Sequence, residues 1–288
     1  MKILDQDIDR HDWATLGRKR FRNEYLLPLR PVVISGGIRH WRASETWTPD
    51  FFRQHYGDRD VTVDDQHWKL ADLLDRIEAS SATAPAPYLR NEWLEKWPKQ
   101  VLADVLPMPQ CSLPNWLDSW AFPSRDHPTF IELYIGGAGA KFPILHFDNW
   151  HTHAFLMQLY GEKEYLALAP DQGKFLYPQD GAAANKSQIN DVLHPDLERF
   201  PLFAQAQGIR FKLSPGETLF VPAGWWHTAR ITSTSITVSI NGANTSNWKS
   251  FARDYCGSIG TYSRVKAAVV LVYMNILGEL LELGSRFA

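Results

Sequence analysis

The sequence contains only two cysteines, Cys111 and Cys256, among its 288 residues. A disulfide framework needs more cysteines in a chain of this size, so both are expected to be ordinary thiols in a reducing compartment. The chain also has almost no excess of charge of one sign, because the formal net charge is -2 and the isoelectric point is about 6.6. No global basic field can therefore collect nucleic acid or anionic membranes, and no nucleic-acid partner is expected.

Long hydrophobic runs are missing as well. The N-terminal stretch MKILDQDIDRHDW has no apolar segment of the length that a signal peptide needs. The apolar run AAVVLVYMNIL (267–277) is shorter than the ~18–20 residues that cross a membrane. The sequence thus predicts a cytoplasmic protein without a membrane segment, and a buried or partner-facing helix at this run.

Apolar and aromatic residues are nevertheless plentiful, at 44% and 13% of the chain, and can fill a sizeable core. Three regions succeed one another. Residues 1–125 mix helix-like segments with short β-rich runs, which predicts an α+β region packed on the middle region. Residues 126–245 are rich in short strand signals, and residues 246–288 return to helical periodicity.

The middle region carries the clearest pattern of secondary structure. Its strand candidates, separated by glycine and proline turn signals, are FIELYIGG, ILHFD, THAFLMQLYG, KEYLALAP, RFKLSPGETLFVPAGWWH and TSITVSING. Many short strands with this punctuation predict a mostly β domain, either an all-β barrel or a jelly roll.

Three histidines and an aspartate crowd into PILHFDNWHTHAF (143–155), although the chain has only ten histidines. Side chains two apart on a strand share a face, so His146 and Asp148 can converge while Phe147 enters the opposite layer. His227, after the turn in LFVPAGWWH, is the best third ligand. Two imidazoles and one carboxylate suit non-haem Fe(II), because they leave metal positions open. An HxD pair alone is a weak signal.

The surrounding segments make the pattern much more specific. With YGEKEYLALAP after the HxD and SPGETLFVPAGWWHTARITSTSITVSIN around the second histidine, the chain resembles the Jumonji-C and cupin-like oxygenases. The resemblance starts near RPVVISGGIRHW and covers roughly residues 25 to 245. It implies a double-stranded β-helix that uses Fe(II), 2-oxoglutarate and dioxygen, with His146, Asp148 and His227 as iron ligands.

Further site residues are implied by the same resemblance. Lys163, in GEK, matches the lysine that pairs with the distal carboxylate of 2-oxoglutarate, and Tyr88 matches a tyrosine that donates its hydroxyl to that carboxylate. Ser239 and Asn241 share a strand face where relatives place polar residues near the co-substrate. The alternatives are a surface lysine, an aromatic anchor and ordinary polar lining of the barrel.

The chain also departs from the family pattern. Pro143 stands where many relatives carry a threonine or serine that bonds 2-oxoglutarate, and Leu156 stands where some have a polar group. A non-catalytic binding module of the same fold therefore stays open, as does a cupin metalloenzyme that does not use 2-oxoglutarate. Trp150, His151 and His153 are candidates for the substrate side of the cavity, and the alternative for the histidines is an exposed loop with one buried histidine.

The resemblance implies hydroxylation, or demethylation where the attacked carbon lies on nitrogen. The substrate is a protein or peptide side chain or a small metabolite, and the sequence does not choose among them. At the C-terminal end, Leu277, Leu280 and Leu281 lie on one apolar stripe of an expected helix. This stripe supports a homodimer, with packing onto the chain's own barrel as the alternative.

Overall fold

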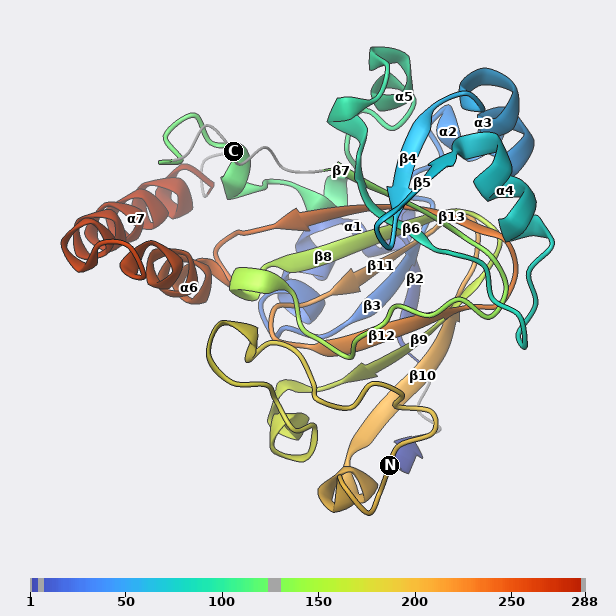
Figure 1. The fold of residues 1–288 in the computed structure, drawn as a ribbon. Helices are drawn as coiled ribbons and strands as arrows, with labels where there is room; N and C mark the ends of the chain where they lie inside the picture. Colours follow the sequence, from blue (N-terminus) through green and yellow to red (C-terminus); the bar gives the residue numbers. More distant parts are fainter. Residues whose placement is uncertain (1, 5–7, 124–130, 286–288) are drawn as a thin grey trace.

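Two β-sheets face each other in the computed structural model, which describes residues 2–4, 8–123 and 131–285. The expected boundary between the N-terminal region and the barrel, at 125/126, lies outside the described residues, as does Phe130 of FIELYIGG. Most neighbouring strands run antiparallel within each sheet, and Figure 1 shows the two sheets stacked with helices outside them. Two facing sheets of mostly antiparallel strands form a jelly roll, so the expected mostly β fold class is confirmed.

The strands match the turn signals of the sequence closely. The smaller sheet has the order β1 (Lys2–Leu4), β10 (Gln207–Leu213), β9 (Lys163–Leu168), β12 (Trp226–Ile231). The larger sheet has the order β2 (Arg10–Asp12), β3 (Val32–Ser35), β11 (Glu217–Val221), β8 (His153–Tyr160), β13 (Ser235–Gly242), β7 (Ile131–Gly136), β6 (Leu89–Trp93). A separate hairpin joins β4 (Asp60–Val63) to β5 (Gln66–Lys69).

One expected strand does not form. The run ILHFD carries only isolated bridges, from His146 to Lys186 and to His227, and a short turn begins at Asn149. The prediction that His146 and Asp148 project from a regular strand is therefore wrong. Phe147 does enter the opposite layer, where its ring meets Trp226 at a centroid distance of 5.0 Å.

The helices of the N-terminal region pack on the outer face of the larger sheet. The α-helices among the described residues are α1 (Trp13–Phe21), α2 (Ala43–Thr46), α3 (Pro49–Tyr56), α4 (Leu70–Glu78), α5 (Lys99–Ala103), α6 (Trp248–Gly260) and α7 (Arg264–Ser285). Phe155 and Met157 of β8 share one buried cluster with Trp41, Phe52 and Leu73 from these N-terminal segments. Alternation along β8 therefore sends one set of side chains into this outer core and the other into the barrel.

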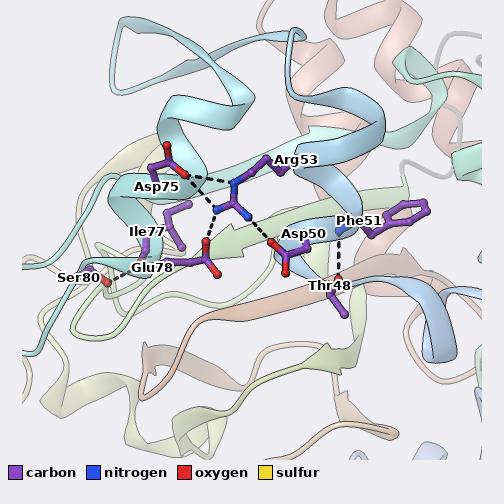
Figure 2. Close-up of polar contacts among 8 residues, drawn as sticks. All are labelled: Thr48, Asp50, Phe51, Arg53, Asp75, Ile77, Glu78 and Ser80. Carbon is purple, nitrogen blue, oxygen red and sulfur yellow. Dashed lines mark hydrogen bonds and ion pairs between the residues drawn. The ribbon is translucent and has the colours of Figure 1, made fainter.

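A polar cluster clamps α3 to α4, and Figure 2 shows it in close-up. The guanidinium of Arg53 on α3 bonds Asp50 on its own helix and reaches across to Asp75 and Glu78 on α4. Thr48 caps the start of α3 by accepting a hydrogen bond from the Phe51 amide at 3.1 Å. These contacts hold α3 and α4 together in the helical layer.

A long insert between β9 and β10 covers the outer face of the smaller sheet. It contains short helical turns at Pro170–Phe175, Gly181–Ala183 and Pro201–Gln205. Leu176, Ile189 and Phe203 from the insert pack against Leu166 and Leu168 of β9. The sequence patterns had suggested no element here, because the segment forms no long periodic stretch.

The C-terminal helices α6 and α7 lie together at one side of the barrel, away from α3 and α4 (Figure 1). The expected single stripe is wrong, since Leu277 and Leu281 pack into the cluster around α6 while Leu280 is 60% exposed. The length argument against a membrane segment is also wrong. Helix α7 has 22 residues, and by length and composition it can cross a membrane, although such evidence from one helix is weak.

Candidate metal centre

Three side chains converge at one end of the barrel. The ligand atoms of His146, Asp148 and His227 all lie within 4.8 Å of one another. His227 is the second residue of β12, and a pair of backbone hydrogen bonds (3.1 Å and 2.6 Å) joins it to His146 on the neighbouring segment. Nε2 of His227 lies 3.9 Å from Oδ2 of Asp148. The structure thus brings together the three residues that the sequence proposed as ligands.

The histidine tautomers suit a metal ion. Nδ1 of His146 lies 3.0 Å from the carbonyl oxygen of Ile144, and Nδ1 of His227 lies 3.1 Å from that of Trp225. A carbonyl oxygen only accepts, so each Nδ1 carries the proton and each Nε2 keeps its lone pair. Fixing the tautomer through the outer nitrogen is the usual arrangement of metal-binding histidines.

The surroundings keep His146 neutral. Burial, with added repulsion from His227, lowers the pKa of His146 to about 4. The ring of Phe142 stacks on the imidazole at a centroid distance of 4.6 Å and an interplanar angle of 20°. A neutral imidazole is the form that binds a metal, so this donor set fits Fe(II) near neutral pH.

A cavity of about 660 Å³ extends from this centre into the barrel. Lys163, at the start of β9, is fully buried at the inner end of the cavity, and its ammonium donates to the Tyr88 hydroxyl at 2.9 Å. Burial lowers the pKa of Lys163 to about 7. The prediction that Lys163 and Tyr88 act together is consistent with this contact, because a buried ammonium facing a cavity attracts a carboxylate.

The two other expected co-substrate residues also line the cavity. Ser239 and Asn241 lie on β13, and the Asn241 amide donates to the Thr152 hydroxyl at 2.8 Å. Thr152 was missed by sequence reasoning, although it lies only four positions after Asp148. Thr152 contributes a hydroxyl side chain to the cavity wall, whereas Pro143, also in the wall, has none.

The remaining two histidines of the cluster have separate structural surroundings. His153 is fully buried, accepts from the Ala223 amide through Nδ1 at 3.0 Å and meets Ser246 Oγ through Nε2 at 2.8 Å. Burial lowers its pKa to about 3, so it is a neutral packing residue. The expectation that His153 lines the cavity rim is wrong, and the alternative of a buried histidine holds.

His151 also stays out of the cavity wall. Its Nδ1 lies 2.5 Å from Oδ2 of Asp254 on α6, which ties the loop after Asp148 to the C-terminal helices. Trp150 does line the cavity, as expected. Both Trp150 and His151 have positive φ angles, of 53° and 50°. Residues other than glycine rarely adopt this backbone conformation, so the surrounding contacts must hold the loop in place.

Sequence reasoning missed a second pair of cavity residues, Glu132 and Tyr134 on β7. The Tyr134 hydroxyl donates to the Glu132 carboxylate at 2.6 Å. A glutamate at the centre of FIELYIGG, between apolar neighbours in an otherwise buried strand, was the available signal. It points inward because Leu133 and Ile135 occupy the alternate positions and pack into the outer core.

Comparison with known proteins places this geometry in context. A family model described as a cupin-like domain matches residues 18–250. Lysine-specific demethylase 8 of Xenopus tropicalis is 29% identical over 232 residues, which cover 77% of this chain and 50% of that protein. Jumonji C domain-containing protein 5 of Drosophila melanogaster is 28% identical over 251 residues, covering 81% of this chain and 59% of that protein.

A third similar protein comes from a plant. Arginine-specific demethylase JMJ20 of Arabidopsis thaliana is 25% identical over 292 residues, covering 88% of this chain and 62% of that protein. The chain spans about half the length of the first of these relatives. The matched part includes the barrel and the segments that carry the three converging ligands.

Proposed function

Because the chain belongs to the family of cupin-like domains, in its Jumonji-C group, we propose that it is an Fe(II)- and 2-oxoglutarate-dependent oxygenase. One observation carries this proposal. Two histidines and one aspartate converge at the mouth of a cavity whose inner end holds a buried lysine without an acidic partner among the described residues. Metal and co-substrate binding are thus supported by the same pocket.

The chain's own residues have separable tasks. His146, Asp148 and His227 would hold the metal ion and leave its remaining positions free for other ligands. With 2-oxoglutarate and dioxygen, bound Fe(II) supplies the oxidising chemistry for attack on a C–H bond. Lys163 and Tyr88 would receive the distal carboxylate of 2-oxoglutarate at the inner end. The buried walls exclude water from the reacting groups.

Hydroxylation of a side chain is the proposed reaction, with loss of a methyl group where the hydroxylated carbon lies on nitrogen. The names of the relatives refer to demethylation of lysine and arginine. A protein or peptide side chain is therefore the proposed substrate.

Turnover of 2-oxoglutarate to succinate tests the proposal. The protein is reconstituted with Fe(II) without oxygen, air is admitted, and succinate is measured for the intact chain and for His146→Ala. We expect the substitution to lower turnover by roughly 100-fold or more, because it removes a metal ligand. His194→Ala is the matched control, since this histidine is 81% exposed on the insert.

The other possible outcomes of this experiment would support different functions. Metal binding without 2-oxoglutarate turnover or binding would favour a cupin metalloenzyme that uses another reaction. Absence of metal binding would contradict the proposal and favour a binding module. Equal loss in the His194→Ala control would show that the assay reports general damage and not the metal centre.

We further propose that α7 pairs with α7 of a second copy. Val265, Val269, Val272, Ile276, Leu280 and Leu283 recur along its outer side, and each is more than half exposed. The opposite side is held inside the chain, where Trp248 Nε1 donates to the Met274 carbonyl at 2.8 Å. A helix with one side fixed to its own domain cannot be surrounded by lipid, so a protein partner suits the free side better.

A further inference from the structure

Glu132 is a carboxylate in the cavity to which the proposed chemistry assigns no task. Its described hydrogen bond comes from the Tyr134 hydroxyl at 2.6 Å, and it forms no ion pair with the described residues. Burial, and to a lesser extent the charges of Asp148 and Glu95, raises the pKa of Glu132. A carboxylate in this setting gains strongly from a cation that enters the cavity.

The strand register places Glu132 at the metal end of the barrel. Gly136, four residues further along β7, is the position where an added Cβ would contact Tyr88 and Ile231. Ile231 pairs with Lys163, whereas His227, four residues earlier on β12, is a metal-ligand candidate. Gly136 and Ile231 thus mark the lysine end of their strands. Glu132 precedes Gly136 by four residues, just as His227 precedes Ile231 by four residues. Glu132 lies on the substrate side of the cavity and not beside the proposed 2-oxoglutarate carboxylate site.

Aromatic side chains flank this carboxylate. Trp93 on β6 pairs directly with Glu132 in the sheet register, and directly opposed residues project to the same face. Trp93 and Tyr134 both line the cavity. The Trp93 ring already holds one ammonium, because Lys96 Nζ lies 4.2 Å from its centroid. A carboxylate between aromatic rings combines ion pairing with cation–π attraction, which together favour a cationic nitrogen over a neutral group.

The cations of the cavity wall do not satisfy Glu132. Arg90 pairs with Asp64 at 2.9 Å, and Lys163 is bonded to Tyr88 at the other end. Lys96 and Lys186 line the cavity without an ion pair to Glu132. The substrate can therefore supply the positively charged partner for the Glu132 carboxylate.

We propose that Glu132, with Trp93 beside it, is the specificity-determining group for a substrate side chain that carries a cationic nitrogen, either an ammonium or a guanidinium. This inference rests on the proposed oxygenase function and adds the residue that selects its substrate. A neutral side chain of the same shape would leave the carboxylate without a partner, which is the arrangement that gives strong discrimination. The competing role is structural, in which Glu132 only orients the Tyr134 hydroxyl.

The test uses four peptide pools of random sequence that differ in one fixed central residue: arginine, its neutral isostere citrulline, lysine, or the neutral norleucine. Succinate formation above the peptide-free level is measured for the intact chain, Glu132→Gln and Tyr134→Phe. Binding of the same pools to the Mn(II)-bound protein with 2-oxoglutarate is measured in parallel. The glutamine keeps the shape and an acceptor for Tyr134 but removes the charge.

We expect the intact chain to favour at least one cationic pool over its neutral counterpart by about tenfold or more. Preference for arginine indicates a guanidinium, and preference for lysine indicates an ammonium. Glu132→Gln should bring the ratio of cationic to neutral peptide close to one, whereas Tyr134→Phe should keep it. A ratio within one protein is independent of general loss of activity.

Three outcomes of the ratio measurement would overturn the inference: no preference in the intact chain, an unchanged preference in Glu132→Gln, or loss of the preference in Tyr134→Phe alone. Absence of binding to every pool would overturn it too. Failure of the oxygenase proposal gives a different result, because no succinate would form with or without peptide. Binding of the pools to the Mn(II)-bound protein would still test the preference in that case. If Glu132→Gln does not fold, absence of a cationic preference in the intact chain still overturns the inference, and Trp93→Leu, which should lower that preference, takes its place in the comparison.

Discussion

Lys163 shows how a single buried residue can couple co-substrate binding to pH. Its ammonium is enclosed by the Tyr88 hydroxyl at 2.9 Å and lies 5.3 Å and 5.4 Å from the centroids of the Tyr88 and Tyr134 rings. Burial lowers its pKa from 10.5 to about 7. Between these two values the unfolded chain binds a proton that the folded chain has released. Stability without co-substrate therefore rises with pH across this window and is lower below pH 7.

Binding of 2-oxoglutarate should reverse this shift, because a carboxylate beside Lys163 favours its charged form. At pH 8 we expect binding to the Mn(II)-bound protein to take up nearly one proton, about 0.9 for a pKa near 7. Calorimetry in two buffers with different ionisation enthalpies measures this number. Lys163→Met should abolish the uptake and weaken binding, whereas Lys186→Met, at another cavity lysine, should keep the uptake. Equal uptake by both variants would contradict the assignment.

Residue by residue, the sequence was informative where a short pattern sets the chemistry. The HxD pair and the distant His227 could be paired through the family resemblance. The surroundings of His153 could not be predicted, since its partners Ala223 and Ser246 come from remote loops. Glu132 was hidden for a similar reason, because its inward orientation depends on the pairing of β7 with β6 and β13.

At the scale of elements, alternation and turn residues predicted most strands and helices. The failures have physical causes. The run ILHFD, which carries two of the candidate ligands, lacks a continuous partner strand and forms isolated bridges only. The insert between β9 and β10 is built from short turns, which have no period to detect. In α7, the apolar run was counted only to Leu277, although the helix continues past Gly278 and Glu279.

Gly278 permits the close packing of α7 on α6. A Cβ at this position would overlap with Cδ1 and Nε1 of Trp248, whose ring is buried and hydrogen-bonded to α7. We expect Gly278→Ala to lower the free energy of unfolding by about 1–3 kcal/mol, because the indole cannot move aside. Urea denaturation measures the change.

The matched control is Gly257→Ala on α6, where an added Cβ meets no atom within 4 Å. There the substitution should stabilise the protein by up to about 1 kcal/mol, since alanine favours the helix more than glycine does. If both variants behave alike, helix propensity and not the contact with Trp248 governs Gly278.

At the scale of the whole molecule, barrel and N-terminal region are interdependent. Strands β2, β3 and β6 belong to the larger sheet, and the N-terminal helices share its outer core. The insert between β9 and β10 and helix α6 also contribute to the cavity wall, through Asn185, Lys186 and Phe251. The apolar outer side of α7 is left uncovered by this arrangement, although the rest of the helix packs into the cluster around Trp248.

Pairing of two α7 helices accounts for this uncovered side. A helix of 22 residues is about 33 Å long, which is sufficient for a substantial two-fold interface. Light scattering should give twice the chain mass of 33.0 kDa. Val269→Glu combined with Ile276→Glu should give the single mass, because it places charges inside the interface.

Asn275→Glu, exposed on the same helix but off the apolar side, is the control and should remain a dimer. Vesicle flotation without detergent separates the alternative. An intact chain of single mass that floats with phosphatidylcholine vesicles would show that lipid covers α7. A single mass without flotation would leave α7 exposed and contradict the dimer equally. Loss of the double mass only in the glutamate pair would support a second copy of this chain as the occupant, because that variant changes the outer side of α7 and leaves its contact with α6 intact.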